Sequence, residues 1–113
     1  MSDKSINDAV DFLYIHGAKY AEAKAHRVYL EEFRKSKKAI LMKEAISDGR
    51  AKSSAAAEME AYADATYIEL LEGLKAATAS EEALRWGLIS AQARIEVYRT
   101  QSANDRAMDR SVK

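Results

Sequence analysis

The stretch YIELLEGLKAATASEEALRWGLISAQARIEVY, from Tyr67 to Tyr98, decides the fold of this chain. Its apolar residues recur every three or four positions, with one interruption at Glu81. They are Leu70, Leu74, Ala77, Leu84, Leu88, Ala91, Ile95 and Tyr98. Such a row marks one face of a long helix. A helix of this length does not bury that face by itself, so the sequence predicts a second helix lying along it.

The composition of the whole chain favours helices over strands. Its 113 residues include no proline and only 4 glycines, and no segment alternates β-branched or aromatic residues with polar ones. The sequence therefore predicts an all-α fold with one helical domain over residues 1–113. The chain has no cysteine, which excludes disulfides, thiolate zinc sites and cysteine nucleophiles.

One polar segment, SDGRAKSS at residues 47–54, separates the helical patterns. Asp48–Gly49 is a turn signal, so the sequence predicts a long, coiled-coil-like antiparallel hairpin whose turn is at about 47–54. The predicted helices cover residues 18–46 and about 55–104, with a short N-terminal helix before them and a frayed tail at about 105–113. Gly17 and Asp64 each either end a helix or lie inside one, and the sequence leaves both readings open.

Residues equidistant from the bend are expected to meet, which pairs Val28 with Leu70 and Ala21 with Ala77. The second helix is longer than the first, so its part beyond Arg85 needs the N-terminal helix or another subunit to cover it. Leu84 and Leu88 are expected to be buried, and self-association is expected to bury the remaining apolar surface. The predicted oligomer interface consists of Trp86, Leu88, Ile95 and Tyr98.

The sequence offers little catalytic chemistry. His16 and His26 lie ten residues apart with no carboxylate at helical ligand spacing, so no metal site is predicted. Adjacent carboxylates splay apart on a helix, and neither a phosphate-binding glycine loop nor a nucleophile turn is present. We therefore expect no enzymatic activity and no cofactor. The N-terminus does not resemble a signal peptide and no stretch has the length of a membrane span, which predicts a cytoplasmic protein without a membrane partner.

The formal net charge is zero, but charges are grouped along the chain. Residues 19–43 carry +5 and residues 44–82 carry −6. The candidate nucleic-acid-binding residues are the cations in and after the basic block: Arg34, Lys35, Lys37, Lys38, Lys43, Arg50 and Lys52. Cations along a helix with aromatic residues nearby are typical of proteins that bind single-stranded nucleic acid.

An alternative interpretation of the basic block is mutual neutralisation across the hairpin. Lys35 to Lys43 is expected to face an acidic stretch that contains Glu58, Glu60 and Asp64. Arg50 and Lys52 lie at the tip of the hairpin, where no acidic partner is expected opposite them. The tip cations are therefore the ones predicted to be the most available to a ligand.

The order of patterns resembles a known family. A basic helix precedes a polar turn with Gly49–Arg50, then AEMEAYADATYIELLEGL at residues 57–74, and a Trp86–Gly87 step inside a long apolar helix. This order resembles the recombination-mediator proteins of T-even bacteriophages, the UvsY type, over about residues 35–110. Lys43 and Gly49–Arg50 match that family's basic signature, whereas Glu44 and Ala45 stand where the family is more basic or aromatic.

The resemblance implies a helical-hairpin oligomer that binds single-stranded DNA and helps to load a recombinase onto strands coated with single-strand-binding protein. The first hypothesis is therefore a non-enzymatic accessory protein in phage DNA recombination. Its partners would be single-stranded DNA, a recombinase or a single-strand-binding protein, and further copies of itself. The alternative is a helical protein–protein interaction module, with a phage or host partner, that binds no nucleic acid.

Overall fold

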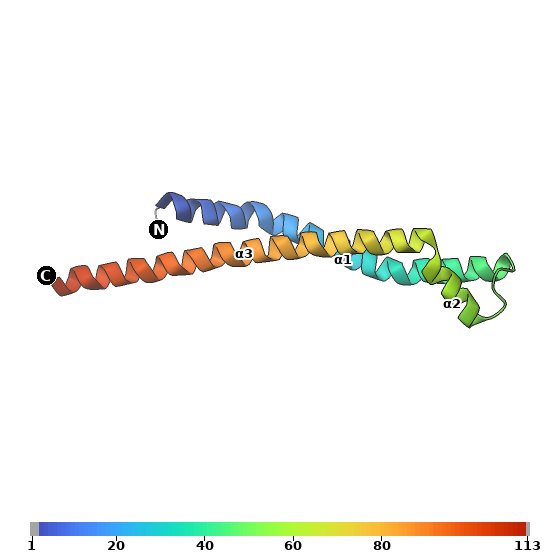
Figure 1. Cartoon of the computed structure of the whole chain (residues 1–113). Helices are drawn as coiled ribbons and strands as arrows, with labels where there is room; N and C mark the ends of the chain where they lie inside the picture. Colours follow the sequence, from blue (N-terminus) through green and yellow to red (C-terminus); the bar gives the residue numbers. More distant parts are fainter. Residues whose placement is uncertain (1–2, 113) are drawn as a thin grey trace. The chain divides into compact units, whose positions relative to one another are not determined.

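The structure is a computed structural model of the chain and describes residues 3–112. It contains three helices, α1 (Asp3–Ser47), α2 (Ser54–Ala63) and α3 (Ala65–Val112), and no strand within the described residues (Figure 1). The all-α prediction is thus confirmed. None of the helices in residues 3–112 combines the length and the hydropathy that a membrane span requires.

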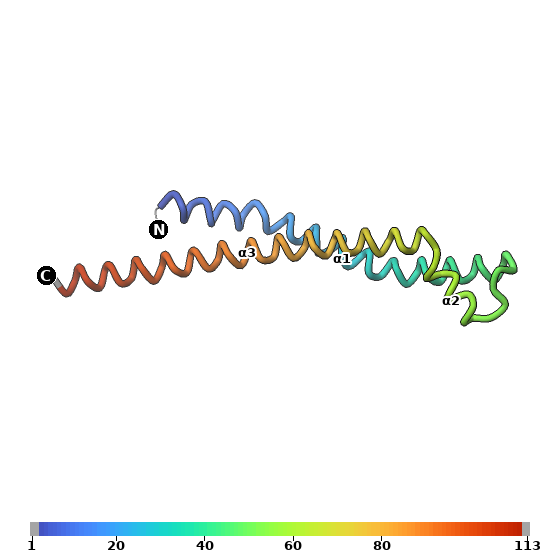
Figure 2. The backbone as a smooth tube through the Cα atoms, viewed as in Figure 1, coloured from blue at the N-terminus to red at the C-terminus, as the bar shows by residue number. Residues whose placement is uncertain are grey.

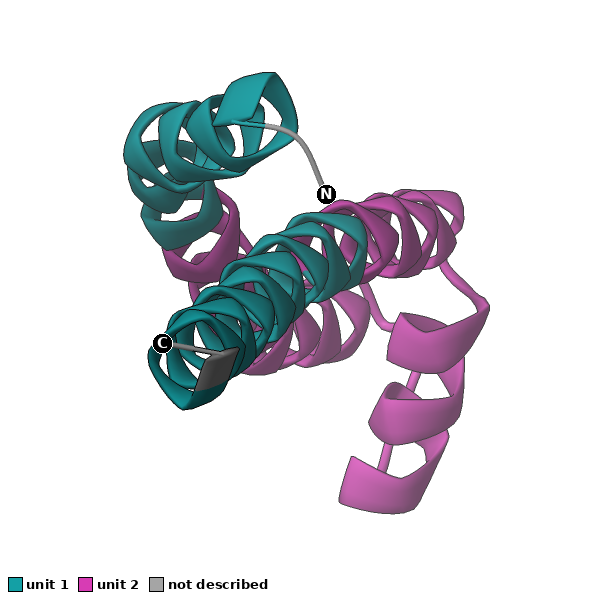
Figure 3. Ribbon diagram, turned by 90° about the vertical axis from the view of Figure 1, so that its left-hand side faces the viewer, with its two compact units in different colours: residues 1–22, 82–113 teal, residues 23–81 magenta. Residues whose placement is uncertain are grey.

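Contacts between residues divide the chain into two compact units. Unit 1 comprises Met1–Glu22 and Glu82–Lys113, and unit 2 comprises Ala23–Glu81 (Figure 3). Each of the two long helices contributes one part to each unit. Unit 2 also contains α2 and the connection from Asp48 to Ser53, which the backbone trace follows from the end of α1 (Figure 2).

The inward-facing side chains of α3 follow alternating steps of three and four residues. The buried or half-buried members are Tyr67, Leu70, Leu74, Ala77, Glu81, Leu84, Leu88, Ala91, Ile95 and Tyr98. This spacing of seven residues per two turns is that of a coiled-coil seam. It confirms the predicted row, but Leu84 and Leu88 are half-buried rather than buried, because the helices that flank them within one chain leave part of each side chain in water.

Two capping residues make α2 a separate helix. Ser53 has an extended backbone at the N-terminus of α2, and its Oγ accepts a hydrogen bond from the backbone N–H of Ala56 at 3.1 Å. Asp64 has φ −67° and ψ 134° at the C-terminus of α2. Its carboxylate accepts a hydrogen bond from the N–H of Thr66 at 2.8 Å and another from the Thr66 hydroxyl. Asp64 therefore ends α2 and caps α3.

Gly17 and the C-terminal tail are the two other places where the helix boundaries were in question. Gly17 lies inside α1, so the N-terminal segment and the predicted first hairpin helix form one continuous helix. At the other end, α3 continues through Val112, whereas a frayed tail was predicted from about residue 105. The physical reason is local: Arg, Ala and Met in this segment are strong helix formers, and no proline or glycine stops the helix.

Within unit 1, the N-terminal half of α1 runs antiparallel to α3 and covers the part of α3 beyond Arg85. The Tyr98 hydroxyl donates a hydrogen bond to Asp3 at 3.0 Å, and the ring of Phe12 lies over Gly87, where an added Cβ would meet it at 2.9 Å. The four residues of the predicted oligomer interface have different surroundings within the chain. Of its four residues, Leu88, Ile95 and Tyr98 lie on the seam and are half-buried, whereas Trp86 is 58% exposed.

Within unit 2, α1 and α3 are also antiparallel, but in a different register from the one predicted. Leu41 packs with Tyr67 in one buried cluster, and Arg27 pairs with Glu81. The prediction treated residues 55–104 as a single helix that starts directly after the turn. Because α2 forms a separate helix that ends before Asp64, residues further along α3 come opposite each position of α1.

Candidate nucleic-acid interface

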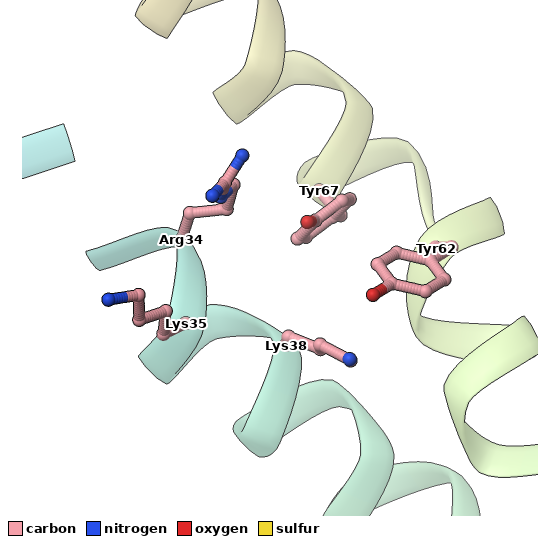
Figure 4. Close-up of a pocket in the computed structure, with 5 residues that line it drawn as sticks. All are labelled: Arg34, Lys35, Lys38, Tyr62 and Tyr67. Atoms are coloured by element: carbon pink, nitrogen blue, oxygen red, sulfur yellow. The ribbon is translucent and has the colours of Figure 1, made fainter. Parts of the chain in front are cut away.

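A groove of about 330 Å³ in unit 2 gathers three cations and two aromatic rings. We call it the basic–aromatic groove, and it is lined by Arg34, Lys35, Lys38, Tyr62 and Tyr67 (Figure 4). The cations lie on α1, Tyr62 lies on α2 and Tyr67 lies in the first turn of α3. Three of the predicted nucleic-acid-binding residues thus share one surface feature.

The local geometry of the three helices explains this gathering. Arg34 and Lys38 are four residues apart and so lie on the same face of α1. Tyr62 and Tyr67 are separated by the break at Asp64, which lets their rings approach each other from two helices. The ring centroids are 5.5 Å apart with an interplanar angle of 64°, an edge-to-face contact of the kind that aromatic pairs prefer.

The two tyrosines differ in burial. Tyr67 is only 6% exposed and belongs to the core cluster with Leu41 and Ala61. Tyr62 is 46% exposed. Tyr67 therefore fixes the floor of the basic–aromatic groove, whereas Tyr62 presents part of its ring to solvent.

Lys38 is the cation most closely engaged in the groove. Its Nζ lies 4.7 Å from the centroid of the Tyr62 ring and 3.6 Å from Oε1 of Glu58. The Tyr62 hydroxyl and the Glu58 carboxylate raise the pKa of Lys38 above its ordinary value, against a smaller opposing effect of desolvation. Lys38 is therefore a permanent cation at neutral pH. In Figure 4 its side chain points toward Tyr62.

The other two cations of the groove have different surroundings. Lys35 is exposed, points away from both tyrosines and pairs with Glu32 at 3.3 Å along α1 (Figure 4). Arg34 is half-buried and forms no ion pair with any of the described residues. Arg34 and Lys38, rather than Lys35, are the cations that face the tyrosines.

The predicted tip of the interface needs correction. Arg50 is not free of acidic partners: its guanidinium lies 3.1 Å from Asp48 and 3.4 Å from Glu60. The connection after α1 folds back, so that the start of α2 brings Glu60 beside the tip. Lys43 and Lys52 are exposed and form no ion pair within the described part of the chain.

The predicted neutralisation across the hairpin is thus realised in part. Lys38 pairs with Glu58 as expected, and Lys37 lies close enough to Asp64 to contribute to lowering the pKa of that carboxyl. The hydrogen bonds from Thr66 contribute more to that shift than Lys37 does. Of the seven predicted cations, Lys38 and Arg50 therefore have carboxylate partners in the acidic stretch.

Sequence reasoning missed the buried ion pair of unit 2. Arg27 Nε lies 2.6 Å from Oε2 of Glu81, and Arg27 Nη2 lies 3.1 Å from Oε1, so the guanidinium binds the carboxylate with two hydrogen bonds. The Glu81 side chain is only 7% exposed. Hydrogen bonding to Glu81, helped by Glu31 at 2.9 Å, raises the pKa of Arg27. The signal was present in the sequence, because Glu81 is the single charged residue in the apolar row.

Tyr62 and Tyr67 were also missed as site residues. Their spacing of five residues does not place them on one helical face, and only the helix break at Asp64 brings their rings together. Aspartate is a favoured N-cap residue, so the sequence pointed to a helix break at Asp64 as one of two possibilities.

Residues 3–112 contain no group of three or more His, Cys, Asp or Glu side chains placed to hold a metal ion. His16 Nδ1 lies 3.1 Å from the carbonyl oxygen of Phe12, and its ring stacks on Phe12 at 4.0 Å. His26 is exposed. Both positions suit histidines on a helix surface.

Comparisons of the chain with protein-family models, with curated protein sequences and with solved structures find no match. The assignment of a function therefore depends on the basic–aromatic groove and on the rest of the surface.

Proposed function

We propose that this chain is a non-enzymatic, cytoplasmic accessory protein of phage DNA recombination that binds single-stranded DNA through the basic–aromatic groove. The observation that carries the proposal is the convergence of Arg34 and Lys38 on Tyr62 and Tyr67 in one groove. Single-stranded nucleic acids are bound by cations that contact phosphates and by aromatic rings that stack with bases. The resemblance to recombination mediators supplies the context of recombination.

The proposal includes self-association and protein partners. Besides Trp86, large apolar side chains on α3 of unit 1 remain in contact with water, among them Ile89 and Val97. Exposed apolar side chains at helical spacing favour packing against another helix. A second copy of the chain, a recombinase or a single-strand-binding protein are the proposed occupants of this surface.

The alternative function, a protein-interaction module without nucleic-acid binding, rests on the same apolar surface. It is also favoured by the ion pairs that engage Arg50 and Lys38 with carboxylates of the same chain. Binding to DNA distinguishes the two functions.

The test is salt-dependent binding of a fluorescent oligothymidylate by the full chain. The wild-type protein is expected to bind at low salt, with log K falling linearly as log salt concentration rises. Replacing both Arg34 and Lys38 by Gln should weaken binding and flatten the slope by about 0.7 for each phosphate contact that is lost.

A matched control is the double replacement of Lys19 and Lys24 by Gln, which removes the same charge from exposed positions of α1 outside the groove. This control should change the slope little. If the wild-type protein has no affinity for the oligonucleotide even at low salt, the DNA-binding proposal is wrong and the protein-interaction module takes its place.

A further inference from the structure

In the basic–aromatic groove, Lys38 already contacts a carboxylate and an aromatic ring of the chain itself. The ammonium group of Lys38 has a carboxylate partner in Glu58, and the same ammonium group lies over the ring of Tyr62. A nucleotide needs both features, because its phosphate binds a cation and its base stacks on an aromatic ring. The Lys38 ammonium group therefore lies over the Tyr62 ring, where the base of a nucleotide would stack. The Glu58 carboxylate lies beside Lys38, where the phosphate of that nucleotide would bind.

The helical spacing of α2 builds this arrangement. Glu58 and Tyr62 are four residues apart on α2, so both side chains lie on the same face, toward Lys38 of α1. The Glu58 side chain is 48% exposed. It can leave Lys38 by rotating into water without any change in the backbone of α2, and its charge then remains solvated.

A phosphate has an advantage over Glu58 in this groove. Arg34 lies one turn before Lys38 on the same face of α1 and also lines the groove, but Glu58 pairs only with Lys38 among the described residues. A phosphodiester between Arg34 and Lys38 contacts two cations, and guanidinium groups bind phosphate oxygens in pairs.

The size of the groove limits the ligand. A volume of about 330 Å³ is at the small end of the range for small-molecule sites. It suits one nucleotide rather than several stacked bases. The buried ring of Tyr67 closes the floor, so only Tyr62 offers a face to a base.

We infer that the basic–aromatic groove binds one nucleotide of a single strand by exchange, in which the phosphate displaces Glu58 from Lys38 and the base takes the place of the ammonium group over Tyr62. The inference deepens the proposed function and rests on it. It assigns Glu58 as an internal competitor of the phosphate and Tyr62 as the stacking residue, neither of which belongs to the basic block.

The test compares oligothymidylate affinities of full-length variants at low salt. Glu58→Gln removes the competing charge but keeps the size of the side chain, and it is expected to tighten binding about two- to fivefold, in line with the small net strength of exposed ion pairs. The control Glu96→Gln in unit 1 makes the same change of charge and releases Arg99 from a comparable pair. It should leave the affinity unchanged.

The stacking role has its own pair of variants. Tyr62→Leu should weaken binding at least about fivefold, as the loss of one stacked base does, whereas Tyr62→Phe keeps the aromatic ring and should bind at least as tightly as the wild type. If Glu58→Gln binds no more tightly than the wild type, or if Tyr62→Leu binds as tightly as the wild type, the exchange is wrong but DNA binding stands. Absence of binding by the wild type and by Glu58→Gln overturns the proposed function and the exchange together.

Discussion

The two units of this chain are built from the same two helices, yet their cores differ. In unit 2 the buried residues include Leu41, Tyr67 and the ion-paired Glu81. In unit 1 only two described residues, Ala9 and Ala91, are buried. Large apolar side chains of unit 1 remain partly or largely in water. The same heptad spacing thus yields a defined core only where α2 adds a third helix.

The difference teaches that the seam of two helices does not by itself bury large side chains. A pair of helices covers each inward side chain from one side, so residues such as Leu88 stay half-exposed. The additional helix in unit 2 encloses its alanines almost completely, with Ala45, Ala57 and Ala61 at 0% exposure. Unit 2 is therefore expected to be the more stable part, and unit 1 the part that gains the most from a partner.

The largest expected effect concerns the cores of the two units. Leu41→Ala in unit 2 should lower the free energy of unfolding by about 2–5 kcal/mol, the usual cost of a large-to-small change in a core. Leu88→Ala in unit 1 should cost less, about 1–2 kcal/mol, since less apolar surface is lost from a half-buried site. Urea denaturation of both variants measures the difference. Equal costs would contradict the contrast between the units.

A second comparison uses two glycines of α3. Gly73 in unit 2 has nothing within 4 Å of an added Cβ, whereas at Gly87 in unit 1 the Cβ would meet the ring of Phe12. Gly73→Ala should stabilise the protein by about 0.5–1 kcal/mol, because alanine favours the helix. Gly87→Ala should gain less or lose stability, because Phe12 must shift. Thermal melts test this, and an equal gain at both glycines would show that Phe12 does not pack closely on α3.

A third test addresses the cap that separates α2 from α3 in unit 2. Hydrogen bonds from Thr66 lower the pKa of the Asp64 carboxyl. A lowered pKa in the folded state contributes stability above the unfolded pKa of about 3.9, and this contribution is lost as the pH falls through the folded value. Asp64→Asn should therefore be less stable than the wild type at neutral pH, and the difference should shrink below about pH 4.

Thermal midpoints measured from pH 7 to pH 3 check this expectation. Asp105→Asn, at an exposed position near the end of α3, controls for the loss of one carboxylate. A constant difference between the wild type and Asp64→Asn over the whole pH range would mean that the amide loses packing or geometry rather than a charged cap.

The smallest expected effect on the folded chain is at the exposed surface of unit 1. Trp86→Gln removes a large apolar side chain that is 58% exposed and should hardly change the stability of a single chain. It should lower the average mass in solution if α3 packs on a second copy. Light scattering at micromolar concentration measures the mass, with Met108→Gln as a control for a large apolar residue nearer the end of α3. A wild-type protein that is monomeric under these conditions contradicts self-association.

The sequence predicted the helices well because their signals are local. The apolar row of residues 67–98 and the turn at Asp48–Gly49 required no knowledge of tertiary packing, and they predicted most of α3 and the end of α1. The register was not predictable in the same way. The register depends on the break at Asp64. There the end of α2 and the N-terminal cap of α3 compete with the tendency of the alanine-rich segment to continue as one helix.

Of the residues in the candidate site, only the cations could be predicted from the sequence. A basic block is visible in the sequence, so Arg34 and Lys38 were named. Their convergence with Tyr62 and Tyr67 depends on three helices, and the pairing of Arg50 with Glu60 depends on how the connection folds back. Contacts of this kind arise from chain reversals, and the spacing of residues along one helix does not encode them.

The ion pair between Arg27 and Glu81 has a consequence for how this chain can change over generations. Removing Arg27 takes from the Glu81 carboxylate, which is only 7% exposed, the guanidinium that binds it with two hydrogen bonds, whereas replacing both residues by apolar side chains of similar volume is often neutral or favourable. Substitutions at the two positions are therefore not independent. In diverged descendants of this chain, positions 27 and 81 should be either both charged with opposite sign or both apolar, and sequences that keep an acidic residue at 81 without a cation at 27 should be rare.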